Sequence, residues 1–210
     1  FRRVEMTEGG PVERWVTLDE FHQEFDDLVF GVRADLFIPA GGRPETVDEG
    51  NWQRFLARDG SRTVDVIVEG ANSFITPAAR RHLQGAGVVV LRDASANKCG
   101  VISSSYEIIG NLLLDEEEFL AHQEVYVKDV LAILERRAAD EANLIFQRHR
   151  EEGGKRTYTE ISDAISVEIN GLKARLFAYF ESRPDLWRKD PYRRALLAHL
   201  PRMIREGPAW

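Results

Sequence analysis

The sequence has one cysteine, no long apolar run and no excess of basic residues, and each absence excludes a class of protein. A lone Cys99 can form neither an internal disulfide framework nor a cysteine-based zinc site, so we expect a reducing, cytoplasmic environment. No apolar run approaches the roughly 20 residues of a membrane-spanning helix. Lys and Arg total 28 against 35 for Asp and Glu, which gives a formal charge of -7. Nucleic acids and anionic membranes bind basic faces, so we expect neither as a partner.

The chain does contain enough apolar sequence to fold. Its 210 residues are 43% hydrophobic and 30% charged, a composition that excludes a wholly disordered chain. This length accommodates one ordinary domain or two small ones. The chain begins at Phe1 and shows no positively charged and then apolar leader, so we expect either a processed N-terminus or a piece of a longer polypeptide.

The first hundred residues alternate between helical and strand patterns. Residues 1–13 are polar and contain Gly-Gly-Pro at 9–11, which predicts a flexible lead-in. A capping box of Thr17 and Glu20 starts a helix that Gly31 ends. Apolar runs at 35–39, 64–68 and 88–91 predict three strands, with a short helix around 51–56 after the first. A second helix between the strands starts at Thr76-Pro77 and runs to about residue 84.

Strands that are apolar on both faces and alternate with helices predict a parallel sheet with right-handed crossovers. Three strands are few for an independent parallel sheet, so the pattern looks like half of a doubly wound domain. From Val101 onward only helical spacing is present. One long helix is capped by Asp115, and a second follows Gly153-Gly154. A last helix at 196–200 comes after a turn between Pro184 and Pro191. The predicted fold class is therefore α/β, a partial doubly wound (Rossmann-like) parallel sheet over residues 1–100 followed by an all-helical C-terminal layer over 101–210.

Three predicted loops at the C-terminal edge of this sheet are rich in Gly and Asn. They cover residues 39–45, 69–72 and 93–105. Ligands of open parallel sheets bind beyond the C-terminal ends of the strands. Glycine lets the backbone approach a ligand closely, and asparagine offers both a donor and an acceptor, a combination that suits a carboxamide or a ribose. The residues alone therefore predict a small polar ligand at this edge.

Simpler interpretations stand beside this one. Gly and Asn are common turn formers, and the serines at 103–105 could cap a following helix. The acidic cluster Asp115–Glu118 is typical of a helix N-terminus. The arginine pairs at 136–137 and 193–194 are typical of solvent-exposed helix faces rather than of anion sites. No Gly-x-Gly-x-x-Gly follows a strand, and no phosphate-binding P-loop is present. The histidines form no His-x-x-x-His pair, so we expect no metal site; they are His22, His82, His122, His149 and His199.

The same three segments resemble glutamate dehydrogenases, and in particular the large-subunit, NAD-specific class. The segments are Asp35-Leu-Phe-Ile-Pro-Ala-Gly-Gly-Arg-Pro-Glu45, Val68-Glu-Gly-Ala-Asn-Ser-Phe-Ile-Thr-Pro77 and Asp93-Ala-Ser-Ala-Asn-Lys-Cys-Gly-Val-Ile-Ser-Ser-Ser-Tyr-Glu107. Their order and spacing are similar to those of the family. The helical region after them is similar in kind only.

The resemblance implies a role for six residues. Ala40 and Gly41 would lie beside the nicotinamide of NAD, and Asn72 would bind the nicotinamide ribose or carboxamide. Asn97 would reach the nicotinamide and the substrate. Val101 would line the pocket for the substrate side chain, and Ser104 would contact a substrate carboxylate.

The sequence also departs from the family pattern. Cys99 stands where the family commonly has a glycine. If that position has a positive φ, a Cys side chain there would cost about 1 kcal/mol or more, and the side chain would also narrow the nicotinamide pocket. Lys98 agrees with the large NAD-specific class. The catalytic Lys and Asp of the family, and its dinucleotide fingerprint, have no counterpart in this chain. The resemblance therefore implies no catalytic residue here and a chain that is inactive alone.

The resemblance implies the C-terminal part of an NAD-dependent glutamate dehydrogenase, which converts glutamate, NAD and water to 2-oxoglutarate, ammonium and NADH. Its expected partners are glutamate or 2-oxoglutarate, the rest of the same polypeptide and further copies in a homo-oligomer. Two alternatives remain open. One is a dehydrogenase for another amino acid, and the other is a non-catalytic assembly or regulatory module derived from a dehydrogenase.

Overall fold

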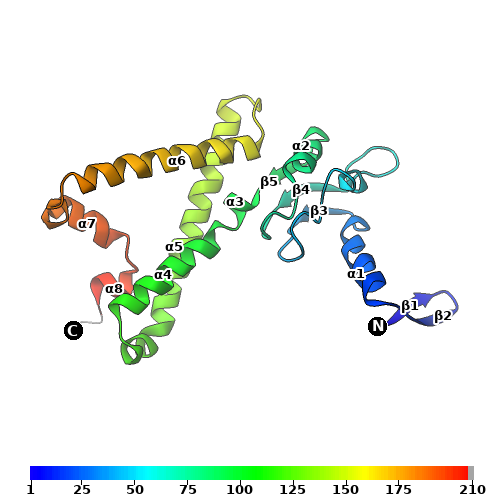
Figure 1. Cartoon of the computed structure of the whole chain (residues 1–210), viewed down its shortest axis with the longest axis horizontal. Coiled ribbons are helices and arrows are strands. Elements are labelled where there is room, and N and C mark those ends of the chain that lie inside the picture. Colours follow the sequence, from blue (N-terminus) through cyan, green and yellow to red (C-terminus); the bar gives the residue numbers. More distant parts are fainter. Residues whose placement is uncertain (208–210) are drawn as a thin grey trace. The chain divides into compact units, whose positions relative to one another are not determined.

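The computed structural model describes residues 1–207 and divides into two compact units, Phe1–Val90 and Leu91–Trp210 (Figure 1). The first unit contains the alternating strands and helices. The second is built of helices from Asp93 onward. The predicted α/β class, with a small parallel sheet and a helical C-terminal region, is confirmed.

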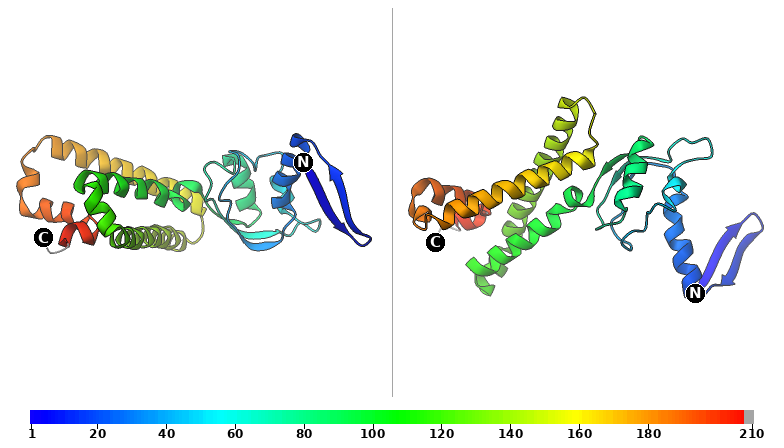
Figure 2. Two further views of the ribbon diagram at one scale, coloured as in Figure 1. Left: turned by 90° about the horizontal axis from the view of Figure 1, so that it is seen from below. Right: turned by 45° about the horizontal axis from the view of Figure 1, so that its top comes forward.

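The polar N-terminus forms a hairpin, so the prediction of a flexible lead-in was wrong. Strands β1 (Arg2–Thr7) and β2 (Gly10–Trp15) pair in antiparallel register, with Arg3 opposite Arg14 (Figure 2). Both of these arginines form ion pairs with Glu24 of α1 (Leu18–Asp27). Val4 and Met6 of β1 alternate with polar residues, but β2 has Glu13 beside Arg14 and both strands are mostly exposed, so the sequence shows no clear period of two.

The helix that follows the hairpin begins and ends where the sequence predicts. Thr17 and Glu20 form a reciprocal capping box at the start of α1. A short 3-10 turn, η1 (Leu28–Phe30), continues it to Gly31.

The three predicted strands form one sheet with the order β3-β4-β5. Strand β3 (Ala34–Phe37) pairs in parallel with β4 (Val64–Val68), placing Leu36 opposite Val66. The short 3-10 helix η2 (Trp52–Phe55) lies between these strands in sequence, and α2 (Pro77–Gly85) connects β4 to β5 (Val89–Leu91). Thr76 caps α2 and Pro77 occupies its first turn, as predicted.

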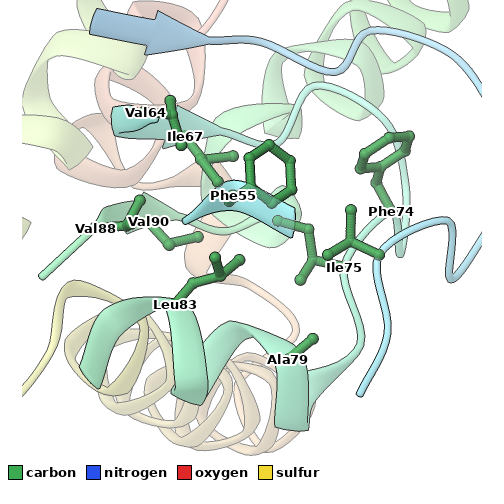
Figure 3. Close-up of a cluster of buried hydrophobic side chains, with 10 residues drawn as sticks. Phe55, Val64, Ile67, Phe74, Ile75, Ala79, Leu83, Val88 and Val90 are labelled. Atoms are coloured by element: carbon green, nitrogen blue, oxygen red, sulfur yellow. The ribbon is translucent and has the colours of Figure 1, made fainter. Parts of the chain in front are cut away.

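The core of the first unit lies between α2 and the sheet. Figure 3 shows Ala79 and Leu83 of α2 pointing toward the strands that carry Ile67 and Val90. Phe55 packs from η2 against the rings of Phe30 and Phe37, with ring centroids 5.1 and 5.9 Å apart. The buried residues of this cluster are Val47, Phe55, Val64, Ile67, Phe74, Ile75, Ala79, Leu83, Val88 and Val90.

Two non-glycine residues have a left-handed backbone in the loops beyond β3 and β4. They are Glu45, with φ of 59°, and Ser73, with φ of 52°. The Glu45 side chain is exposed, and only its backbone N–H is used, in a hydrogen bond to the Ser73 carbonyl. We expect Glu45→Gly to raise the free energy of unfolding by about 0.5–1 kcal/mol, because glycine has no Cβ penalty at this φ. Urea unfolding measures this change, and a loss of stability would show that the Glu45 side chain contributes a contact.

Helices form the second unit. They are α3 (Asp93–Ala96), α4 (Lys98–Leu113), α5 (Glu116–Glu151), α6 (Tyr158–Glu181), the 3-10 turn η3 (Leu186–Arg188), α7 (Asp190–Ala198) and α8 (Arg202–Glu206). Asp115 caps α5 in a box with Glu118, which confirms the interpretation of that acidic cluster. Gly153 and Gly154 have φ of 63° and 73° and end α5 as predicted.

The end of the chain differs from its prediction. Pro191 lies inside the first turn of α7, where a missing N–H costs nothing, rather than in the turn before it. The helix stops at Ala198, before Leu200, and a separate short helix α8 follows Pro201.

Helix α4 packs on α5 through one of its faces. Tyr106 of α4 clusters with Tyr126 and Val130 of α5 and with Met203 of α8. The Tyr126 hydroxyl donates to the Tyr106 carbonyl, and burial raises the pKa of Tyr126 above its ordinary value. A Cβ atom at Gly110 would lie 3.1 Å from the Tyr126 hydroxyl, so the helices meet closely there. Among residues 1–207, no helix is both long and apolar enough to cross a membrane.

Candidate functional site

In the first unit, the loops after β3 and β4 are hydrogen-bonded to each other. The Ala71 N–H donates to the Pro39 carbonyl at 2.6 Å, and the Glu45 N–H donates to the Ser73 carbonyl at 2.7 Å. The structure thus brings the segment that contains Ala40 and Gly41 beside the segment that contains Asn72. All three of these residues are exposed.

Glycines allow this close approach between the two loops. A Cβ atom at Gly70 would lie 3.1 Å from the Pro39 carbonyl oxygen, and one at Gly42, whose φ is 114°, would lie 3.0 Å from the Phe74 ring. At Gly41, by contrast, a Cβ atom would meet nothing within 4 Å. Gly41 therefore leaves open backbone at the surface, while Gly42 and Gly70 set the geometry of the loops.

A buried ion pair flanks the second loop and was missed in the sequence. Glu69 follows β4 directly and is 0% exposed, and Arg80 in the first turns of α2 is 6% exposed. The Arg80 guanidinium donates to both Glu69 carboxylate oxygens, with a shortest N–O distance of 2.9 Å. The sequence did contain a signal for this pair: Arg80 lies on the buried face of α2 with Ala79 and Leu83, and a buried arginine requires a partner of opposite charge.

The third predicted loop is helical, so that expectation was wrong. Residues 93–96 form α3, and α4 starts at Lys98, immediately after Asn97. The serines at 103–105 lie inside α4 and cap no helix. Ser103 and Ser105 donate back to the carbonyls of Gly100 and Val101, which satisfies their hydroxyls within the helix.

Asn97, Val101 and Ser104 share one face at the start of α4. Their spacing of four and then three residues places them above one another on a helix. Val101 is 73% exposed and Ser104 is also exposed, on a different side from the Tyr106 face that packs on α5. Within the described residues the Ser104 hydroxyl makes no hydrogen bond, unlike its two serine neighbours. This face presents an amide, an apolar group and a hydroxyl to the surface of the second unit.

The Cys99 departure carries no backbone strain. Cys99 lies in α4, and Glu45 and Ser73 are the non-glycine residues with positive φ among residues 1–207, so the positive φ that would strain a Cys side chain does not occur at Cys99. Its thiol is directed to the Leu134 carbonyl of α5, at 3.7 Å. Lys98 forms an ion pair with Glu141, also on α5. Both side chains thus fasten α4 to α5.

The six residues that the sequence predicts for a site have groups suited to binding a ligand, but none that moves protons near neutral pH. Asparagine amides donate and accept hydrogen bonds, and a serine hydroxyl can donate to a carboxylate. None of the six carries a group that titrates near pH 7.

Curated proteins with similar sequences are glutamate dehydrogenases. The NAD-specific glutamate dehydrogenase of Neurospora crassa is 37% identical over 183 residues, which are 81% of this chain and 17% of that protein. The probable NAD-specific glutamate dehydrogenase of Schizosaccharomyces pombe is 36% identical over 184 residues, 82% of this chain and 16% of that protein. The chain thus spans about a sixth of the length of these relatives.

A solved structure and a family model complete the comparison. The crystal structure of glutamate dehydrogenase from Peptoniphilus asaccharolyticus aligns with a TM-score of 0.48 and 17% identity, covering 85% of this chain and 41% of that one. The model of the glutamate/leucine/phenylalanine/valine dehydrogenases matches residues 5–157, which include all three segments identified in the sequence. The chain therefore belongs to the glutamate/leucine/phenylalanine/valine dehydrogenase family.

Proposed function

We propose that this chain is the C-terminal part of a longer NAD-dependent glutamate dehydrogenase. The enzyme would oxidise glutamate with NAD and water to 2-oxoglutarate, ammonium and NADH. The observation that carries the proposal is the identity of 36% and 37% to NAD-specific glutamate dehydrogenases over four-fifths of the chain. The matched region covers only 16–17% of the length of those relatives, which supports a part of a longer enzyme.

The cofactor part of the proposal assigns Ala40, Gly41, Asn72 and Asn97 to NAD. The open backbone at Gly41 fits a flat ring that approaches without meeting a side chain. The exposed Asn72 amide offers the donor and the acceptor that a carboxamide or ribose needs. NAD, when bound, would supply the acceptor for the hydride of the substrate, and each of these four residues is assigned a contact to its nicotinamide half.

The substrate part assigns Val101 and Ser104 to glutamate. The Ser104 hydroxyl, unused within the described residues, donates a hydrogen bond to a substrate carboxylate. Val101 contacts the aliphatic part of the glutamate side chain through its exposed methyl groups. The Lys that polarises the substrate and the Asp that transfers protons lie elsewhere in the longer enzyme, so residues 1–210 alone should not turn over.

The domain arrangement and the setting belong to the same proposal. Residues 1–100 would be the C-terminal half of a dinucleotide-binding domain, and residues 101–210 a helical C-terminal region. The three-stranded sheet supports this, because doubly wound dinucleotide-binding sheets have about twice as many strands. The enzyme would be a cytoplasmic homo-oligomer, with the rest of the polypeptide as a partner of this chain.

A panel of amino acids tests the function of the full-length protein. We expect NADH formation with glutamate at a kcat/KM at least about 100-fold above that with leucine, valine or phenylalanine, because a hydroxyl aimed at a second carboxylate loses its partner with an apolar side chain. A preference for one of the apolar amino acids would assign the enzyme to another substrate.

A further inference from the structure

The loop that contains Asn72 is enclosed between two residues of a buried ion pair. This loop joins β4 to α2 and covers residues 69–76. Glu69 begins it, Arg80 follows it in α2, and the two side chains form the ion pair. The Arg80 Nη2 group also donates to the Ile75 carbonyl at 2.9 Å, inside the loop itself. One guanidinium therefore fixes the beginning of the loop, through Glu69, and its end, through Ile75.

The loop needs such a constraint because its backbone is unusual. Ser73, next to Asn72, has a φ of 52°, a conformation that a serine seldom adopts. The hydrogen bonds from Ala71 to Pro39 and from Glu45 to Ser73 join the outer side of the loop to the segment after β3. Arg80 acts from the inner side, so Asn72 is displayed by a loop that is fixed on both sides.

Stability alone does not account for charges at this place. Removing two charges from water carries a desolvation cost that can exceed their attraction, and well-packed apolar residues are often at least as stabilising. An arginine with four directed hydrogen bonds, three to Glu69 and one to the Ile75 carbonyl, by contrast specifies one loop shape.

We propose that Arg80 is a positioning residue for NAD: through Glu69 and the Ile75 carbonyl it fixes the loop that presents Asn72 to the nicotinamide ribose or carboxamide. This inference rests on the proposed function, since it assumes that Asn72 contacts NAD. Arg80 itself, buried under the loop, contacts neither NAD nor substrate.

The test is steady-state kinetics of the full-length enzyme with Arg80→Met, with Arg80→Lys, and with Arg81→Met as the matched control. Arg81 is the exposed neighbour on the same helix and forms no ion pair among residues 1–207. We expect Arg80→Met to raise the KM for NAD about tenfold or more, since a displacement near 1 Å can cost up to roughly 100-fold. Arg80→Lys, which keeps the charge but has only three N–H donors on one atom and cannot make all four hydrogen bonds, should raise it less. Arg81→Met should leave it unchanged.

KM is the deciding quantity because it does not depend on how much of the enzyme is folded. A purely structural Arg80 would lower the yield and the apparent kcat while leaving the KM for NAD as in the unmodified enzyme, and that result would overturn the inference. Arg80→Lys supplies the same comparison if the Met variant does not accumulate. An unmodified full-length enzyme that fails to reduce NAD with glutamate would instead contradict the proposed function, so the two failures are distinguishable.

Discussion

Replacing Asn97 by alanine in the full-length enzyme is expected to lower kcat/KM for glutamate oxidation by about 100-fold. Asn97 stands at the junction of α3 and α4 and shares a helix face with Val101 and Ser104. In the proposed site the Asn97 amide orients the nicotinamide toward the substrate. The rate of hydride transfer depends on that orientation, so losing the amide should lower kcat/KM. Initial rates of NADH formation at varied NAD and glutamate measure the effect.

The matched control for this variant is Asn111→Ala. Asn111 is exposed on the same helix, α4, more than three turns farther along, and should leave both rate and affinity unchanged. Unchanged turnover and NAD affinity in Asn97→Ala would remove Asn97 from the site. Equal losses in both variants would point to damage to α4 rather than to a role in binding.

Leu83→Ala is expected to lower the free energy of unfolding of the first unit by about 3–5 kcal/mol. Leu83 is 0% exposed and points from α2 into the core against the sheet (Figure 3). Alanine removes buried methyl groups and leaves a cavity, while the helix propensity of the position stays high. Urea unfolding followed by circular dichroism measures the shift.

Two features of the chain serve as controls for the Leu83 prediction. Arg81→Ala, on the exposed side of the same helix, should change stability by less than about 0.5 kcal/mol. An unfolding transition of the second unit should not move, because Leu83 packs within the first. A loss below about 1 kcal/mol in Leu83→Ala would show that the core of α2 and the sheet is looser than described.

Much of the fold followed from local signals in the sequence. Four signals each predicted an element where the structure has it. They are the capping boxes at Thr17 and Asp115, the Thr76-Pro77 helix start and the apolar run at 64–68. These signals are readable because the interactions behind them join residues at most four apart. The N-terminal hairpin escaped because its strands are mostly exposed and polar, so no buried face revealed the period of two.

The candidate site likewise contains parts that the sequence predicted and parts that it did not. Gly and Asn marked the loops after β3 and β4 correctly, but the segment 93–105 is helical, since a Gly and three serines within it did not outweigh helix formation. The Glu69–Arg80 pair joins residues eleven apart across a turn, and sequence spacing alone does not reveal such a contact. The roles of the six residues came from family resemblance and stay predictions until the variants are measured.

The most direct test of the central claim, that this chain is part of a longer dehydrogenase, is the mass of the native polypeptide. An antibody raised against residues 1–210 would follow the protein through purification from its source, with glutamate-dependent NADH formation assayed in each fraction. The account predicts a product several times larger than 23.9 kDa that co-purifies with the activity. A product of about 23.9 kDa, separate from any such activity, would contradict it and favour the non-catalytic module.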